Sequence, residues 1–188
     1  MVIIGLAGTN GSGKDTVAHM LVARHGFYFG SATDMLGEEL KKRGSPLERA
    51  NKSALSAQWR QKHGLGAVVD VAVGLANQEG ANKLVVGSLR NPGEADRVHE
   101  LGGIVVWVDA DPKVRYARIA SGRRGRVEDQ KTYEQFIAEE QAEMQYSGDQ
   151  TTLNMSGVKE KADVYIDNDD SDIDGFKDRS EKALSAWL

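Results

Sequence analysis

A glycine-rich stretch close to the first residue restricts the possible fold of this chain more than any other feature. An apolar run from Val2 to Ala7 leads into the letters GTNGSGK, residues 8–14, and a segment with helical spacing of apolar residues follows. Runs of β-branched residues are typical of buried parallel strands, and glycines between a strand and a helix let successive backbone N–H groups point at one anion. The stretch therefore predicts a phosphate-binding loop at the carboxyl end of the first strand.

Further apolar runs alternate with helical patterns along the rest of the chain. We expect strands at residues 2–7, 27–30, 83–90, 104–110 and 162–168. The stretch from Pro46 to about Gln78 predicts two helices, because Gly64 and Gly66 interrupt it. Short strands that alternate with helices are typical of a parallel sheet covered on both faces. The sequence thus predicts a single domain over residues 1–188, a three-layer α/β/α doubly wound fold with a five-stranded parallel sheet.

Charge and composition exclude several classes of function. The chain has 28 acidic and 24 basic residues, a formal net charge of -4, and no cysteine. No overall basic field attracts nucleic acid or a membrane surface, so we expect neither as a partner. Without cysteine there are no disulfides, thiolate nucleophiles or cysteine-bound zinc, and the opening apolar run is too short for a signal peptide. We expect a cytoplasmic protein that is a monomer or a homodimer.

The glycine-rich loop has the spacing of a P-loop, which holds a nucleoside triphosphate. Its backbone N–H groups would surround the phosphates, and Lys14 would reach the outer ones. The residues expected to bind ATP are Gly8, Asn10, Gly11, Ser12, Gly13, Lys14, Asp15 and Thr16.

Asp15 stands where such loops normally carry a serine or threonine, whose hydroxyl holds magnesium. One interpretation is structural, since a negative residue in the first turn of a helix is favourable by about 0.3–1 kcal/mol. The other is that Asp15 holds the ion directly or through water, while Thr16 still offers a hydroxyl. The two interpretations are compatible. We expect Asp15 and Thr16 to be the metal-binding residues, and ATP and Mg²⁺ to be the cofactors.

Several segments resemble the nucleoside monophosphate kinase and dephospho-CoA kinase branch of P-loop phosphotransferases. GKDT, residues 13–16, looks like the variant of monophosphate kinases that places threonine second after the lysine. ADVYIDND, residues 162–169, resembles the last strand of dephospho-CoA kinases. SATDMLGEEL, residues 31–40, is similar to an adenylate kinase segment and matches it in register at Ser31, Asp34, Met35 and Leu36.

The resemblance implies roles for particular side chains. Arg90, at the end of LVVGSLR, would grip the phosphate of the acceptor, and Asp34 and Arg60 would contact the acceptor; the alternative for Arg60 is a solvated helix face. Residues of about 33–79 would form a helical acceptor-binding flap, and a short lid at about 121–129 would close over the transferring phosphoryl group. The catalytic residues would be Lys14, Arg90, Arg118 and Arg123, with Arg124 among the nucleotide-binding residues.

These expectations together predict an ATP-dependent kinase that transfers the γ-phosphoryl group to a nucleotide-like small molecule. The first acceptor class is a nucleoside or deoxynucleoside monophosphate, and the alternative is dephospho-CoA. Gly37 replaces an arginine that adenylate kinases place on the acceptor phosphate, and Gly87 stands where the family has an acidic residue. These departures keep open a nucleotide-binding protein with little turnover. An ATPase that acts on a partner is a further alternative.

An acidic stretch late in the chain has a different pattern. In DSDIDGFKDRSE, residues 170–181, the acidic residues and Gly175 have the spacing of an EF-hand calcium loop. Against this, Lys177 stands where an apolar residue is usual, and a strand leads into the stretch where an EF-hand has a helix. The alternative is a connection that caps the last helix.

Overall fold

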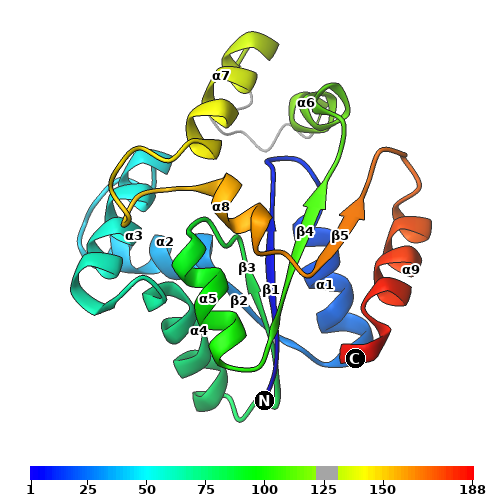
Figure 1. Ribbon diagram of the computed structural model, residues 1–188, viewed down its shortest axis with the longest axis horizontal. Coiled ribbons are helices and arrows are strands. Elements are labelled where there is room, and N and C mark those ends of the chain that lie inside the picture. Colours follow the sequence, from blue (N-terminus) through cyan, green and yellow to red (C-terminus); the bar gives the residue numbers. More distant parts are fainter. Residues whose placement is uncertain (122–130) are drawn as a thin grey trace.

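The computed structural model describes residues 1–121 and 131–188 and confirms the predicted fold class (Figure 1). Five parallel strands form one sheet in the order β2-β3-β1-β4-β5. With β1 at the centre, the chain winds first to one side and then to the other, so loops from both sides meet at the carboxyl ends of the strands. The strands are β1 (Val2–Gly8), β2 (Tyr28–Ser31), β3 (Lys83–Gly87), β4 (Ile104–Asp109) and β5 (Val164–Asp167).

Helices cover both faces of the sheet and its carboxyl edge. α1 and α9 pack on one face, α4, α5 and α8 pack on the other, and α6 and α7 lie above the carboxyl ends of the strands (Figure 1). The sequence did not predict α8, a six-residue helix whose N-terminus is capped by the side chain of Asn154. The helices are α1 (Lys14–His25), α2 (Ala32–Lys42), α3 (Arg49–His63), α4 (Ala67–Gln78), α5 (Pro92–Glu100), α6 (Pro112–Ser121), α7 (Tyr133–Met144), α8 (Met155–Glu160) and α9 (Ile173–Ala183).

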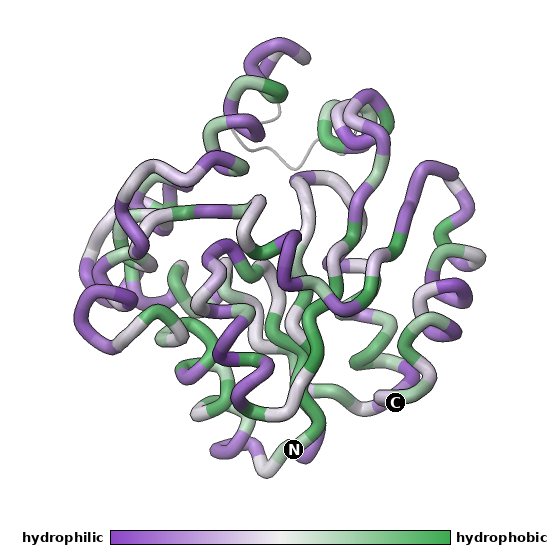
Figure 2. Tube along the Cα trace, in the orientation of Figure 1, coloured by the Kyte–Doolittle hydropathy of each residue, from purple (hydrophilic) through white to green (hydrophobic). Residues whose placement is uncertain are grey.

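Alternation along the strands divides the apolar side chains between two cores. In β4, Val106 and Val108 pack with α1 and α9, whereas Val105 and Trp107 pack with α4, α5 and α8. Figure 2 shows the resulting apolar centre of the sheet and the polar outer surfaces of the helices. Along residues 1–121 and 131–188, none of the helices combines the length and the apolar character that crossing a membrane requires.

The segment predicted as an acceptor-binding flap, about 33–79, divides into two parts. α2 and α3 share a small separate cluster in which Leu36, Leu40 and Leu55 pack with Trp59. α4 instead contributes Val69, with two alanines, to the main core, because its run AVVDVAVGLA is apolar on the face toward the sheet. α2 also reaches the main core through Met35, whereas α3 packs on α2 and α4 and is the part of this segment farther from the sheet.

Candidate functional site

The glycine-rich loop between β1 and α1 leaves a helix N-terminus without a capping side chain. Gly13 occupies the N-cap position with a left-handed backbone, φ 99°, so the first turn of α1 has no side-chain acceptor at its N-cap. Within the loop, the Ser12 N–H donates to the Thr9 carbonyl at 3.3 Å, and the buried Ser12 hydroxyl has no hydrogen-bond partner in residues 1–121 and 131–188. Unpaired donors at a helix N-terminus are what a bound phosphate uses.

Lys14 is the positive group of this loop. Its side chain lies inside the protein, the residue being only 8% exposed, and Nζ is 3.4 Å from the Thr9 carbonyl oxygen. Burial lowers the pKa of Lys14 to about 8; the Asp15 carboxylate opposes this shift, and the positive charges of Arg90 and Arg49 add to it. A phosphate beside Lys14 would supply the negative partner that this buried ammonium group lacks.

The residues predicted to bind metal lie in the first turn of α1. Asp15 is exposed and Thr16 is half-buried. Magnesium is typically held by one or two protein oxygens together with substrate phosphates, so a carboxylate and a hydroxyl beside the phosphate loop fit this ion. Elsewhere in the described ranges, no three acidic or histidine side chains gather into a metal-binding group.

Gly87, at the end of β3, has no room for the acidic side chain that the resemblance would place there. A Cβ atom on Gly87 would lie 2.5 Å from the Cε2 atom of Phe29, whose ring comes from the neighbouring strand β2. The next residue, Ser88, has a left-handed backbone with φ 66°, which is uncommon for any residue but glycine. This turn directs the chain toward Arg90 at the carboxyl edge of the sheet.

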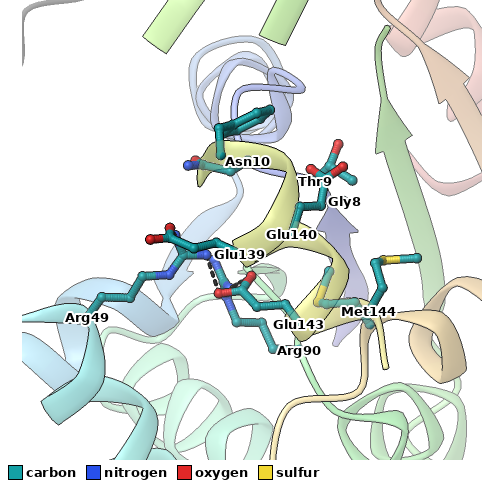
Figure 3. Close-up of a pocket in the computed structure, with 11 residues that line it drawn as sticks. Gly8, Thr9, Asn10, Arg49, Arg90, Glu139, Glu140, Glu143 and Met144 are labelled. Atoms are coloured by element: carbon teal, nitrogen blue, oxygen red, sulfur yellow. Dashed lines mark hydrogen bonds and ion pairs between the residues drawn. The ribbon is translucent and has the colours of Figure 1, made fainter. Parts of the chain in front are cut away.

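A small pocket opens beside the phosphate loop (Figure 3). Two guanidinium groups reach into it, from Arg49 at the start of α3 and from Arg90 after β3, and both bind the carboxylate of Glu143 on α7. The Arg90 NH1 atom is 2.7 Å from Glu143 Oε2. The pocket is lined by Gly8, Thr9, Asn10, Arg49, Arg90, Phe136, Glu139, Glu140, Glu143, Met144 and Met155.

Arg115 of α6 connects α7 to the phosphate loop through contacts with Glu140 and Asn10. Its guanidinium is almost fully buried, donates to the Ala110 carbonyl at 2.7 Å and to the Asn10 carbonyl at 3.4 Å, and forms an ion pair with Glu140. It also lies 5.5 Å from the centre of the Phe136 ring. With every side of the guanidinium occupied, Arg115 is a structural anchor for α7.

Asp109 ends β4 beside the loop. Its Oδ1 atom accepts hydrogen bonds from the Thr9 hydroxyl at 2.7 Å and the Ala110 N–H at 2.9 Å, and its Oδ2 atom accepts one from Trp107 Nε1 at 3.2 Å. Burial alone would raise the pKa of Asp109, but the hydrogen bonds from Thr9, Trp107 and Ala110 outweigh it and lower the pKa. An ionised carboxylate therefore fixes the first part of the loop to β4.

Arg118 contacts the segment that follows β5. Its Nη2 atom donates to the Asp170 carbonyl at 2.5 Å and lies 3.5 Å from Asn168 Oδ1, while its Nη1 atom is buried and has no hydrogen-bond partner among the described residues. The Asn168 amide donates in turn to the Ser12 carbonyl at 2.8 Å. Arg118 is thus held beside the loop by the segment that follows β5.

The remaining predicted residues are not gathered at the pocket. Arg60 is buried and bound to Glu94, so its predicted contact with the acceptor finds no support in this geometry. Asp34 is exposed in the first turn of α2 and does not line the pocket. Arg123 and Arg124 lie outside the described residues, as does the predicted lid apart from Ser121.

The acidic stretch 170–181 forms a helix cap and not a calcium loop. α9 begins at Ile173, inside the stretch, and Asp172 caps it by accepting a hydrogen bond from the Gly175 N–H at 2.9 Å. Asp170 is bound to Arg179, and Asp174 to Lys177. Helical residues cannot wrap around an ion as an EF-hand loop does, so the capping interpretation is the correct one.

Three important residues of the site were not predicted. Arg49 and Glu143 are 94 residues apart, and neither belongs to a local motif, so only the fold brings them together. Asp109 had a usable signal, because an acidic residue directly after a buried strand next to the loop strand lies at the ligand-binding edge of a parallel sheet.

Comparisons with known proteins identify a family and a shared fold. A protein-family model described as an AAA domain matches residues 4–145. A UPF0200 protein of Pyrococcus horikoshii is 30% identical over 195 residues, covering 100% of this chain and 98% of that protein, and one of Pyrococcus abyssi is 32% identical over 176 residues, covering 90% and 89%. The crystal structure of shikimate kinase from Bacteroides thetaiotaomicron matches with a TM-score of 0.65 at 14% identity and covers 98% of both chains. At that identity the structural match shows a shared fold alone.

Proposed function

The chain belongs to the AAA domain family and to the UPF0200 family, and we propose that it is a kinase. In this proposal it uses ATP and Mg²⁺ to phosphorylate a nucleotide-like small molecule. The observation that carries this proposal is one pocket with anion-binding groups on two sides. Gly8, Thr9 and Asn10 of the phosphate loop line one side, where Lys14 contacts the Thr9 carbonyl oxygen, and Arg49 and Arg90 line the other. A kinase needs such a pair of sites because it must hold a triphosphate and an acceptor in line.

The proposed reaction places the γ-phosphoryl group between these two sides. An oxygen of the acceptor attacks the γ-phosphorus, and the bond from that phosphorus to the bridging oxygen of ADP breaks. A phosphate dianion attacks without losing a proton, whereas a hydroxyl acceptor would release its proton to solvent. Lys14 and the loop N–H groups would stabilise the charge on the leaving ADP, and Arg90 would orient the acceptor. Asp15 and Thr16 would hold Mg²⁺, which would supply further positive charge next to the phosphates. Arg118 and the arginines of the predicted lid, Arg123 and Arg124, would add to it.

A nucleoside or deoxynucleoside monophosphate is the acceptor class that we propose first. Arg90 and Arg49 favour an acceptor with its own anionic group near the γ-phosphate, and a monophosphate accepts the phosphoryl group on that anion. Dephospho-CoA accepts it on a ribose hydroxyl and is the second candidate. The partner that we propose is therefore a small molecule. We also propose that the protein is cytoplasmic.

The test measures ADP release from ATP and Mg²⁺ with a panel of acceptors: nucleoside monophosphates, their deoxy forms, dephospho-CoA and shikimate. We expect one monophosphate to raise ADP release well above the rate without acceptor, and Lys14→Met to abolish this increase. ATP binding without ADP release for any acceptor would make the chain a nucleotide-binding protein, and equal release without acceptor would make it an ATPase.

Asp15→Asn tests the metal site within the same assay. Because magnesium would lose a charged ligand, the magnesium concentration for half-maximal ADP release should rise several-fold, with a smaller change in ATP affinity. Glu79→Gln, an exposed carboxylate after the end of α4 and outside the pocket, is the control for the change of charge. An unchanged magnesium titration would remove Asp15 from the metal site.

A further inference from the structure

The pocket arginines already hold an anion that belongs to the protein itself. Glu143 places its carboxylate between the guanidinium groups of Arg49 and Arg90, where the proposed function puts the acceptor (Figure 3). The side chains of Arg49, Arg90 and Glu143 are 28%, 27% and 20% exposed, so the group is open to solvent on one side. We name Arg49 and Arg90 the arginine clamp.

The charges in the clamp do not balance. Two guanidinium groups face one carboxylate that both of them share, and the next carboxylate, Glu139, is 4.0 Å from Arg49 and is also bound to Lys131 at 2.7 Å. Lys14 adds a further positive charge near the pocket, since its Nζ atom is 3.4 Å from the carbonyl oxygen of Thr9, a residue that lines the pocket. A doubly charged anion would therefore fit the clamp better than the single charge of Glu143.

Glu143 can leave the clamp without displacing the rest of α7. It is the last residue but one of the helix, and Gln145, which follows the helix, has an extended backbone. Phe136 and Glu140 hold the preceding turns against Arg115. Met144 packs against the main core and keeps the end of the helix in place, so a change of rotamer in the partly exposed Glu143 side chain is enough to empty the clamp.

From these observations we propose that the arginine clamp binds a phosphomonoester group of the acceptor, and that Glu143 occupies the clamp in the free protein as an internal competitor. The inference rests on the proposed function for the identity of the acceptor, whereas the anion preference follows from the clamp itself. A tethered carboxylate competes at an effective concentration on the order of millimolar. A ligand with one carboxylate gains nothing over Glu143, but a phosphomonoester dianion satisfies both arginines. Glu143 is thus a specificity-determining residue that excludes acceptors bearing only a carboxylate.

The test measures binding of inorganic phosphate and of acetate by calorimetry, above the second ionisation of phosphate. Lys14→Met serves as the background, because it removes phosphate binding by the loop. Phosphate should bind and acetate should not. Adding Glu143→Gln should tighten phosphate binding roughly tenfold and make acetate binding measurable, since the competitor has lost its charge. Adding Arg49→Gln should remove phosphate binding.

Two control variants separate competition from other effects. Glu134→Gln makes the same change of charge on the exposed first turn of α7 and should leave phosphate affinity unchanged. Glu140→Gln loosens the anchor to Arg115 without emptying the clamp, so it should not reproduce the gain. Weaker phosphate binding in Glu143→Gln would mean that Glu143 orients the arginines, and an equal gain in Glu140→Gln would mean that helix movement is responsible. Either result overturns the proposal.

Failure of the proposed function gives a different result. If the unmodified chain binds no ATP while the Lys14→Met background still binds phosphate through Arg49, the kinase proposal is wrong and the clamp remains. If ATP binds and is turned over but Arg49→Gln leaves phosphate affinity unchanged, the clamp proposal is wrong and the kinase remains.

Discussion

Two groups of arginine and glutamate lie close together in this protein and differ in burial. Arg60 and Glu94 join α3 to α5, with side chains that are 2% and 1% exposed. Arg49, Arg90 and Glu143 join α3, the segment after β3 and α7, and each keeps a fifth or more of its side chain exposed. The two groups share the same chemistry, so burial and hydrogen bonding decide what each can do.

In the buried pair, every major polar group has a partner. Arg60 donates to Glu94 Oε1 from Nε at 3.1 Å and from NH2 at 3.0 Å, and to the Thr151 carbonyl from NH1 at 2.5 Å. Glu94 Oε2 accepts from the backbone N–H groups of Arg90 at 2.7 Å and Asn91 at 3.2 Å. No group remains for a ligand. The buried pair instead fixes the backbone of Arg90, on which the exposed group depends.

The largest effect should come from breaking the buried pair. Arg60→Leu leaves the Glu94 carboxylate buried without its cation, and the free energy of unfolding should fall by about 3–5 kcal/mol. Arg49→Leu removes a partly exposed arginine from the same helix and should cost about 1 kcal/mol or less. Urea unfolding of both variants measures the difference. Equal losses would show that burial does not separate the two groups.

Lys14 is a third case for this comparison. It is a buried cation like Arg60, but in the described residues it has no ion pair like the one between Arg60 and Glu94. Its pKa falls from 10.5 to about 8 on burial, which corresponds to a cost of about 3 kcal/mol below pH 8. Lys14→Met keeps the length of the side chain and removes this cost. We expect the free protein to gain about 1–3 kcal/mol of stability at neutral pH while it loses ATP binding.

The pH dependence of that gain has a definite sign. Between pH 8 and 10.5 the unfolded chain carries the proton on Lys14 and the folded chain does not, so the unmodified protein gains stability with rising pH relative to Lys14→Met. The advantage of the variant should therefore be constant below pH 8 and shrink as the pH approaches 10.5. Unfolding curves at several pH values measure it, and an advantage that grows with pH would contradict the assigned shift.

The smallest effect should come from an exposed carboxylate whose partner is a backbone group. Asp172→Ala removes the cap of α9 and should lower the free energy of unfolding by about 1 kcal/mol. Calcium should leave the melting temperature of both the unmodified chain and the variant unchanged, because the stretch 170–181 is helical. A rise in melting temperature with calcium, lost in Asp172→Ala, would restore the EF-hand interpretation.

Most of the fold could be predicted from the sequence because its signals are local. The loop GTNGSGK, the alternating strands and the break between α3 and α4 at Gly64 and Gly66 each occupy a few consecutive residues. α8 was missed because six residues are too few to establish a helical period.

The site was only partly predictable, because its side chains come from distant segments. Arg90, which the family resemblance of LVVGSLR singled out, lines the pocket, but Arg49 and Glu143 meet only through the packing of α3 and α7. We expected Arg60 at the acceptor or on a solvated helix face, because the spacing of residues along a helix does not show which other element packs against that helix. Burial against Glu94 is a tertiary property, and no local pattern encodes it.

Asn168 has a consequence for the order in which the protein becomes active during its synthesis. Its side-chain amide supports the Ser12 carbonyl across 156 positions of the chain, and β5 and α9 close the face of the sheet on which α1 rests. Synthesis therefore produces the phosphate loop 156 residues before the side chain that supports it. The loop of a nascent chain stays without this hydrogen bond until Asn168 has been added and β5 has paired with β4.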